Sequence, residues 1–143
     1  MQGKWEFDYS IIPHSGTWNS INGQSIPFLQ ASHFNAPLRT VEASIHAGNE
    51  LDSGSFIKVS PGMFKISSVK QIKNNEGWLV RGYNLSDQEI TVSLSKWKRS
   101  KTCWLLNLAE NKVTRLESNK SGIVTFQARP HEIVSIGFYE ENG

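Results

Sequence analysis

The feature that most constrains this chain is a run of short stretches, from residue 56 to residue 139, each closed by turn residues. In residues 90–95, Ile90, Val92 and Leu94 alternate with Thr and Ser. A period of two is typical of a half-buried strand, and many short strands with regular turns are typical of a sandwich or barrel. The predicted strands are residues 56–60, 64–73, 78–84, 90–95, 103–108, 112–116, 123–128 and 132–139.

Two further strands are predicted in the N-terminal third of the chain. In residues 5–11, Trp5, Phe7, Tyr9 and Ile11 alternate with polar residues, which indicates another half-buried strand. Residues 39–45, which precede a cluster of turn residues, are predicted to form a second, short strand. No helical periodicity longer than about two turns is present. The predicted fold class is therefore all-β, an antiparallel β-sandwich whose core lies between two sheets.

The segment PHSG at residues 13–16 ends the first predicted strand. Pro13 has no N–H to donate to a strand ladder, and Gly16 can supply a turn conformation with positive φ. Residues 17–35 have no sustained period and are rich in Ser, Asn, Gly and Gln. We therefore predict one sandwich domain over residues 1–143, with an irregular arm at about residues 14–38.

Composition limits the partners and the compartment. The formal charge of +2 is too small to indicate binding to nucleic acid or to an anionic membrane surface. No apolar run approaches the roughly 20 residues of a membrane span, and Met1 to Lys4 lead directly into a predicted strand, so no signal peptide is expected. The single cysteine, Cys103, excludes an internal disulfide and suits a reducing compartment, so the predicted localisation is cytoplasmic.

The residues do not form a recognisable catalytic set. The thirteen carboxylates fall mostly in turns, on solvent faces or near the C-terminus, with no evident acid pair of the kind a glycosidase needs. His14, His33, His46 and His131 are widely spaced; His14 and His33 could meet only if the arm folds back. Cys103 fits small core filler. We predict no catalytic residue and no metal site in this chain.

The five tryptophans leave one binding function open. Trp78 and Trp104 lie in strand patterns and are predicted to be core, whereas Trp18 and Trp97 are close to loops and could stack on sugar rings. Trp97 also lies inside the basic cluster of residues 96–101, which has the composition of a nucleic-acid patch. Because the rest of the chain is nearly neutral, a solvated loop with Trp97 on the sheet edge is favoured.

A series of short motifs in a fixed order carries a family resemblance. The chain resembles the C-terminal β-sandwich region of glycoside hydrolase family 38, the retaining α-mannosidases, whose sandwich is of the galactose-mutarotase-like, or supersandwich, type. The motifs are residues 7–18 (FDYSIIPHSGTW), 31–38 (ASHFNAPL), 55–56 (SF), 69–73 (VKQIK), 78–84 (WLVRGYN), 107–110 (NLAE) and 129–136 (RPHEIVSI).

The resemblance implies a larger parent enzyme of mannose metabolism. In that family an N-terminal domain carries a divalent metal, usually zinc, and an aspartate nucleophile, and a helical bundle follows. Nothing in this chain matches those motifs, so no catalytic residue is carried over. The chain is expected to be a fragment of a larger multidomain enzyme and inactive alone. Its expected function is that of a non-catalytic accessory domain, which buttresses the catalytic and helical domains and the substrate cleft.

The resemblance also places the interdomain candidates. The arm runs along the catalytic domain in the resembling enzymes, so His14, Trp18, Phe34 and Asn35 are predicted to form an exposed docking surface. For His14, a corner packed on its own domain is an equal alternative. Arg81 lies on a partly apolar strand face, which indicates either an ion pair, with Glu110 as the favoured partner, or an interdomain contact.

Two alternatives to the accessory role remain. An independent carbohydrate-binding sandwich would expose Trp18 or Trp97 to a mannoside ligand. An immunoglobulin-like adhesion domain would show a clean strand pattern, against which the arm weighs. If the accessory role holds, the isolated domain should expose an apolar patch, and self-association is an expected consequence.

Overall fold

The computed structural model describes residues 3–18, 26–45, 47–48, 53–72, 76–98 and 100–140. The chain divides into two units, Met1–Asn49 and Glu50–Gly143. We describe each unit by itself. That all 143 residues form a single domain stays a prediction.

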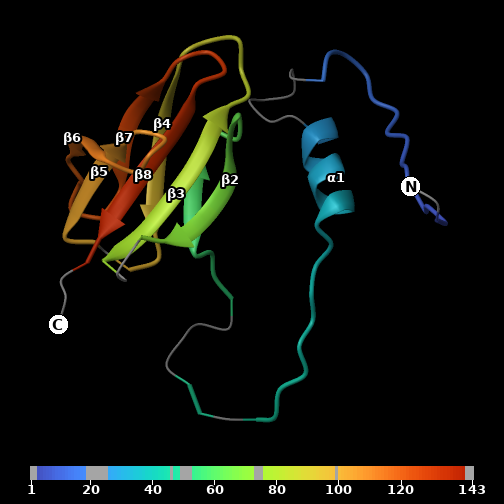
Figure 1. Ribbon diagram of the computed structural model, residues 1–143, viewed down its shortest axis with the longest axis horizontal. Coiled ribbons are helices and arrows are strands. Elements are labelled where there is room, and N and C mark those ends of the chain that lie inside the picture. Colours follow the sequence, from blue (N-terminus) through green and yellow to red (C-terminus); the bar gives the residue numbers. More distant parts are fainter. Residues whose placement is uncertain are drawn as a thin grey trace. The chain divides into compact units, whose positions relative to one another are not determined.

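The second unit is a β-sandwich, and its two sheets face each other in Figure 1. One sheet has three strands in the order β1-β4-β7, and the other has five in the order β2-β3-β8-β5-β6. Every pairing between neighbouring strands is antiparallel. The strands are β1 (Ile57–Ser60), β2 (Phe64–Gln71), β3 (Gly77–Asn84), β4 (Ile90–Lys96), β5 (Thr102–Leu106), β6 (Lys112–Leu116), β7 (Val124–Ala128) and β8 (Ile133–Tyr139).

The predicted all-β sandwich is confirmed. Each strand predicted from residue 56 onward is present, with ends that differ from the prediction by no more than two residues. The alternation succeeds where a strand has a neighbour to bond and an inner face to bury. In β7, for example, Val124, Phe126 and Ala128 are buried while the two residues between them are exposed.

The core lies between the two sheets. The rings of Phe64 in β2 and Phe126 in β7 meet edge-on with their centroids 5.6 Å apart, which joins one sheet to the other. Each large buried side chain contributes roughly 1.5–3 kcal/mol. The buried members are Phe64, Val80, Val92, Leu94, Cys103, Val124, Phe126, Ala128, Val134, Ile136 and Phe138.

A second, smaller apolar cluster consists of Leu79, Leu106 and Tyr139, with Ile72 and Trp104 packed against it. Leu79 alternates with Val80 along β3, so this cluster lies on the outer face of the five-stranded sheet. The Lys112 Nζ lies 3.9 Å from the centroid of the Tyr139 ring and 5.7 Å from that of Trp104. The lysine thus covers aromatic surface that the three-stranded sheet cannot reach.

The first unit contains one described helix, α1 (Ile26–Asn35), which the sequence analysis missed. The prediction of an irregular arm is therefore wrong over these residues. Pro27 stands near the helix start, where its missing N–H costs nothing, and the Asn35 Nδ2 donates to the Ala31 carbonyl 3.0 Å away near its end. Leu29 and Phe34 are both exposed on different sides of the helix, so no apolar stripe reveals it.

The two strands predicted in the first unit are wrong. Residues 5–11 and 39–45 contain no strand, and their large apolar side chains, among them Phe7, Tyr9 and Val41, are exposed. Alternation indicates only that a segment has an apolar side; it forms a strand when a neighbour takes up its N–H and C=O groups. One detail of this region is confirmed, because Gly16 has a φ of 77°.

Asn84 fastens the turn after β3 to the end of β7. Its side chain is fully buried, and its Oδ1 accepts the Ser86 N–H at 2.8 Å. Its Nδ2 faces three carbonyl oxygens, those of Gln88 at 2.7 Å, Arg129 at 3.0 Å and Ala128 at 3.1 Å. Three acceptors around one nitrogen require an NH₂ group there, so only an amide fits.

Asn84→Asp is expected to lower the free energy of unfolding by about 3 kcal/mol or more at neutral pH, because it turns a carboxylate oxygen toward three carbonyls. The measurement is urea unfolding followed by tryptophan fluorescence. Asn119→Asp is the matched control: the Asn119 Oδ1 accepts N–H groups from Ser121 and Ile123, which a carboxylate can also do. Equal losses in the two variants would contradict this account of Asn84.

Candidate functional site

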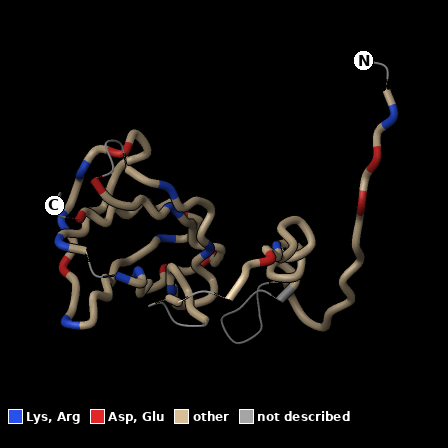
Figure 2. Tube along the Cα trace, turned by 90° about the horizontal axis from the view of Figure 1, so that it is seen from below, with Lys and Arg blue, Asp and Glu red and all other residues tan. Residues whose placement is uncertain are grey.

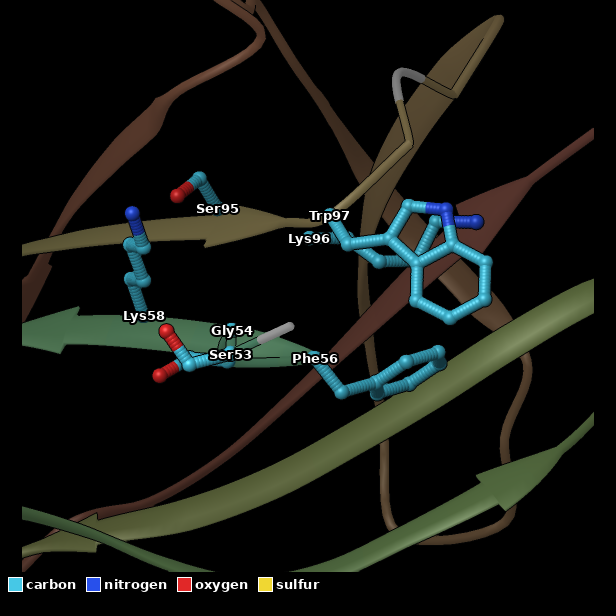
Figure 3. Close-up of a pocket in the computed structure, with 8 residues that line it drawn as sticks. Ser53, Gly54, Phe56, Lys58, Ser95, Lys96 and Trp97 are labelled. Atoms are coloured by element: carbon cyan, nitrogen blue, oxygen red, sulfur yellow. The ribbon is translucent and has the colours of Figure 1, made fainter. Parts of the chain in front are cut away.

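A pocket of about 530 Å³ opens in the second unit beside β1 and β4. The register of these strands pairs Ile57 with Lys96 and Lys58 with Ser95, which brings residues from two distant segments together. In Figure 3 the rings of Trp97 and Phe56 lie next to each other, and Lys58 and Ser95 lie together farther along the strands. The lining residues are Ser53, Gly54, Ser55, Phe56, Lys58, Ser95, Lys96 and Trp97.

The aromatic side of the pocket is a chain of three rings. The Phe56 ring meets Trp78 edge-on at 4.9 Å between centroids and Trp97 at 5.4 Å. The Trp97 N–H donates to the Phe56 carbonyl at 2.9 Å, which continues the β1–β4 pairing by one residue. Trp97 is nevertheless 54% exposed. Its indole is therefore held in place from behind while much of its surface stays accessible.

The charges around the pocket are positive. The Lys96 side chain is only 4% exposed and forms an ion pair with Glu140. The Lys58 side chain is exposed, and among the described residues it has no ion-pair or hydrogen-bond partner. The Lys98 Nζ lies 4.7 Å from the centroid of the Trp97 ring. None of the described lining residues is acidic, so Lys58 adds a positive charge that no described neighbour balances.

The basic cluster of residues 96–101 does not extend into a larger basic surface. Figure 2 shows Lys and Arg distributed around the sandwich and interleaved with Asp and Glu. Lys96 is already neutralised by Glu140, and Arg99 lies outside the described residues. Trp97 directly follows β4, the central strand of its sheet, and packs on Phe56.

Arg81 forms the ion pair that the sequence favoured. Its Nη2 lies 4.0 Å from the Glu110 Oε1, and the Lys70 Nζ lies 2.5 Å from the same oxygen. The Arg81 Nε donates to the Ser135 Oγ at 2.8 Å. Ser135 is buried on β8, so the guanidinium satisfies a hydroxyl that water does not reach.

Glu110 reaches this position through an unusual backbone. Its φ is 68°, a left-handed conformation that costs a non-glycine residue about 1 kcal/mol or more. The Glu110 N–H donates to the Asn107 carbonyl at 2.9 Å, which closes the turn between β5 and β6. Two cations at one carboxylate oxygen offset that strain. Whether Arg81 also makes an interdomain contact stays a prediction.

The other predicted site residues lie in the first unit. His14, Trp18, Phe34 and Asn35 are all exposed. The structure places Phe34 and Asn35 in the last turn of α1 and His14 just before the Gly16 turn. That they form a docking surface stays a prediction, as does the alternative of a packed corner for His14. His46 lies outside the described residues.

Metal ligands and the cysteine thiol are the other candidates for chemistry among the described residues. No group of three or more His, Cys, Asp or Glu among them could hold a metal ion. Cys103 is buried in the core, and burial raises the pKa of its thiol to about 11, although the charge of Lys96 opposes this. A thiol held in its protonated form is a poor nucleophile.

No helix in the described part of the chain is long and apolar enough to cross a membrane.

Comparison with known families decides the relationship. The model of the glycosyl hydrolases family 38 C-terminal beta sandwich domain matches residues 63–136, just over half of the chain. The chain belongs to this family. No curated protein and no solved structure matches the chain.

The family match covers the sandwich from the start of β2 to the middle of β8. The Arg81, Glu110 and Ser135 cluster lies inside the matched residues, as do Ser95, Lys96 and Trp97 of the pocket. Phe56 and Lys58 lie outside them. The predicted docking residues of the first unit also lie outside, so the family 38 match does not bear on them.

The Cys103 thiol gives a prediction for pH dependence. Its pKa is 9.0 as an ordinary thiol and about 11 in the folded domain. The contribution to stability is therefore complete below pH 9 and is lost as the pH rises from 9 toward 11. Urea unfolding measured across this range should show that the free energy of unfolding falls as the pH rises. When each protein is compared with its own value at pH 8, this fall should be smaller in Cys103→Ala than in the unchanged protein. An identical slope in the variant would contradict it.

The Arg81 cluster gives a second prediction, tested by a double-mutant cycle. Arg81→Met should cost about 1–2 kcal/mol, because Ser135 loses its buried partner. Glu110→Gln should cost less than about 1 kcal/mol, because that pair is partly open to water. The coupling between them, read from urea unfolding, should be at most about 1 kcal/mol. A Glu110→Gln loss larger than that of Arg81→Met would reverse this ranking.

Proposed function

We propose that this chain is a non-catalytic accessory domain of a retaining α-mannosidase-type glycoside hydrolase. The domain buttresses the catalytic and helical domains of its parent and helps to shape the substrate cleft. The family match over residues 63–136 carries the proposal, because that family is by description one C-terminal domain of a glycosyl hydrolase. A domain of this kind supplies a rigid interface and leaves proton transfer to groups elsewhere.

The metal of the reaction belongs to the same division of labour. A retaining glycosidase of this family would use a divalent metal. The metal, zinc by expectation, would be held by the catalytic domain of the parent. The single buried Cys103 suits a cytoplasmic location, which we propose for the parent as well.

The proposal is tested first by activity. The purified chain should not hydrolyse an aryl α-mannoside, with or without added Zn²⁺. Co-expression with the catalytic and helical domains of the parent should give a complex that does hydrolyse it. Arg81→Ala and the four-fold variant of His14, Trp18, Phe34 and Asn35 to Ala, each shown to be folded by circular dichroism, should weaken that complex.

Two results would overturn the proposal. One is turnover by the pure chain that survives repeated purification. The other is a catalytic domain of the parent that is fully active and equally stable without this chain. A matched substitution on the opposite sheet, Thr91→Ala, should leave the complex unchanged, because its hydroxyl bonds Gln127, its one partner within the described ranges, across the outer face of β4 and β7.

A further inference from the structure

We propose that the pocket beside β1 and β4 binds a sugar ring that carries a negative charge, as a phosphate or a carboxylate. The choice of a sugar rests on the proposed function, because the parent acts on carbohydrate. The choice of an anion rests on the pocket alone. This pocket combines an accessible aromatic ring with a lysine, Lys58, that has no ion-pair partner among the described residues.

The aromatic side supplies a surface for the ring. The C–H faces of sugars pack on aromatic side chains, and tryptophan offers the largest such area with few rotatable bonds. Trp97 is prepared for this contact because Phe56 and the backbone pairing hold it before any ligand arrives. Figure 3 shows the Lys96 side chain running behind the indole, and the Lys96–Glu140 ion pair anchors that side chain. Little ordering entropy remains to be lost on binding.

The charged side selects the anion. Lys58 projects at the pocket with no partner among the described residues, and Lys98 lies over the Trp97 ring. A phosphate or carboxylate would complete charge-assisted hydrogen bonds that a neutral sugar leaves unmade. Lys58 pairs with Ser95, two residues before Trp97, so a ligand that reaches both would carry its acidic group to one side of an apolar ring face.

The remaining lining groups suit a hydroxylated ligand. Ser53, Ser55 and Ser95 provide hydroxyls that can both donate and accept hydrogen bonds. Gly54 between two of them leaves the backbone accessible. The volume of about 530 Å³ falls in the range of small-molecule sites. A nucleotide could also stack on Trp97, but the mixed charges around the sandwich in Figure 2 provide no track for a phosphate backbone.

The test uses the full chain and follows the indole Nε1–H signal of Trp97 in ¹H–¹⁵N spectra. The probes are glucuronate and mannose 1-phosphate, with neutral mannose, inorganic phosphate and a single-stranded RNA oligonucleotide as comparisons. We expect a saturable shift with one or both anionic sugars, and an affinity about tenfold higher than for mannose. Glucuronate and mannose 1-phosphate together distinguish carboxylate from phosphate recognition.

Two pairs of variants separate the contributions. Lys58→Gln should remove the preference for the anion, whereas Lys120→Gln, a change at an exposed lysine outside the pocket, should not. Trp97→Ala should reduce affinity about tenfold, whereas Trp18→Ala should leave it unchanged. Lys58 is exposed, so its variant should fold normally even if the Trp97 variant does not.

Four results would overturn the inference. They are equal binding of mannose and the anionic sugars, equal binding of inorganic phosphate alone, tighter binding of the RNA, and no shift with any sugar up to about 10 mM. Each can occur while the parent complex still forms and hydrolyses its substrate, so failure here is distinguishable from failure of the accessory role.

Discussion

The structure of the sandwich depends on one constraint, which is that the middle of the five-stranded sheet must be covered on both faces. In β3, Val80 is buried toward the three-stranded sheet while Leu79, its neighbour, is fully buried on the opposite face. In β8 every residue from Val134 to Tyr139 is buried. The inner cover is a second sheet, and the outer cover is made by side chains such as Trp104 and Lys112. The Arg81 cluster belongs to that outer cover, because it supplies a partner for the buried Ser135 hydroxyl.

The β2 edge of the same sheet, in contrast, is not covered on both faces. Three strands cannot cover five, and the second half of β2, residues 67–71, is exposed throughout. An exposed edge invites pairing with another chain, and charged side chains there oppose it. Lys70 provides such a charge and reaches Glu110 as well. The bulge between Ile66 and Ser68 further interrupts the edge. The charge and the bulge thus both oppose pairing of another chain along the β2 edge.

The strands of the sandwich were predictable from sequence because the local signals agree with the long-range ones. Turn residues end each strand, and alternation matches a face that is buried. Around Trp5 and Phe7 the alternation is as clear, yet no strand forms, because a sequence pattern does not supply the neighbouring strand that takes up the backbone hydrogen bonds. The helix α1 was missed for the opposite reason. Its start and end residues are favourable, but its apolar residues lie all around the helix and give no period to detect.

The candidate site, like the fold, contains residues that the sequence predicts and residues that only the strand pairing brings together. The Arg81–Glu110 pair was predictable, because the parity of β3 places an arginine on a partly apolar face, where it needs a carboxylate. Trp97 was recognised as open to ligands, but Phe56 and Lys58 carry no local signal. Nothing near them in sequence indicates that their segment pairs with the one around Trp97, some forty residues later. Only the β1–β4 register does so, by setting Lys58 opposite Ser95. A binding site assembled across strands is therefore hidden from periodicity for the same physical reason that makes it rigid: its side chains are positioned by backbone pairing between segments far apart in the chain.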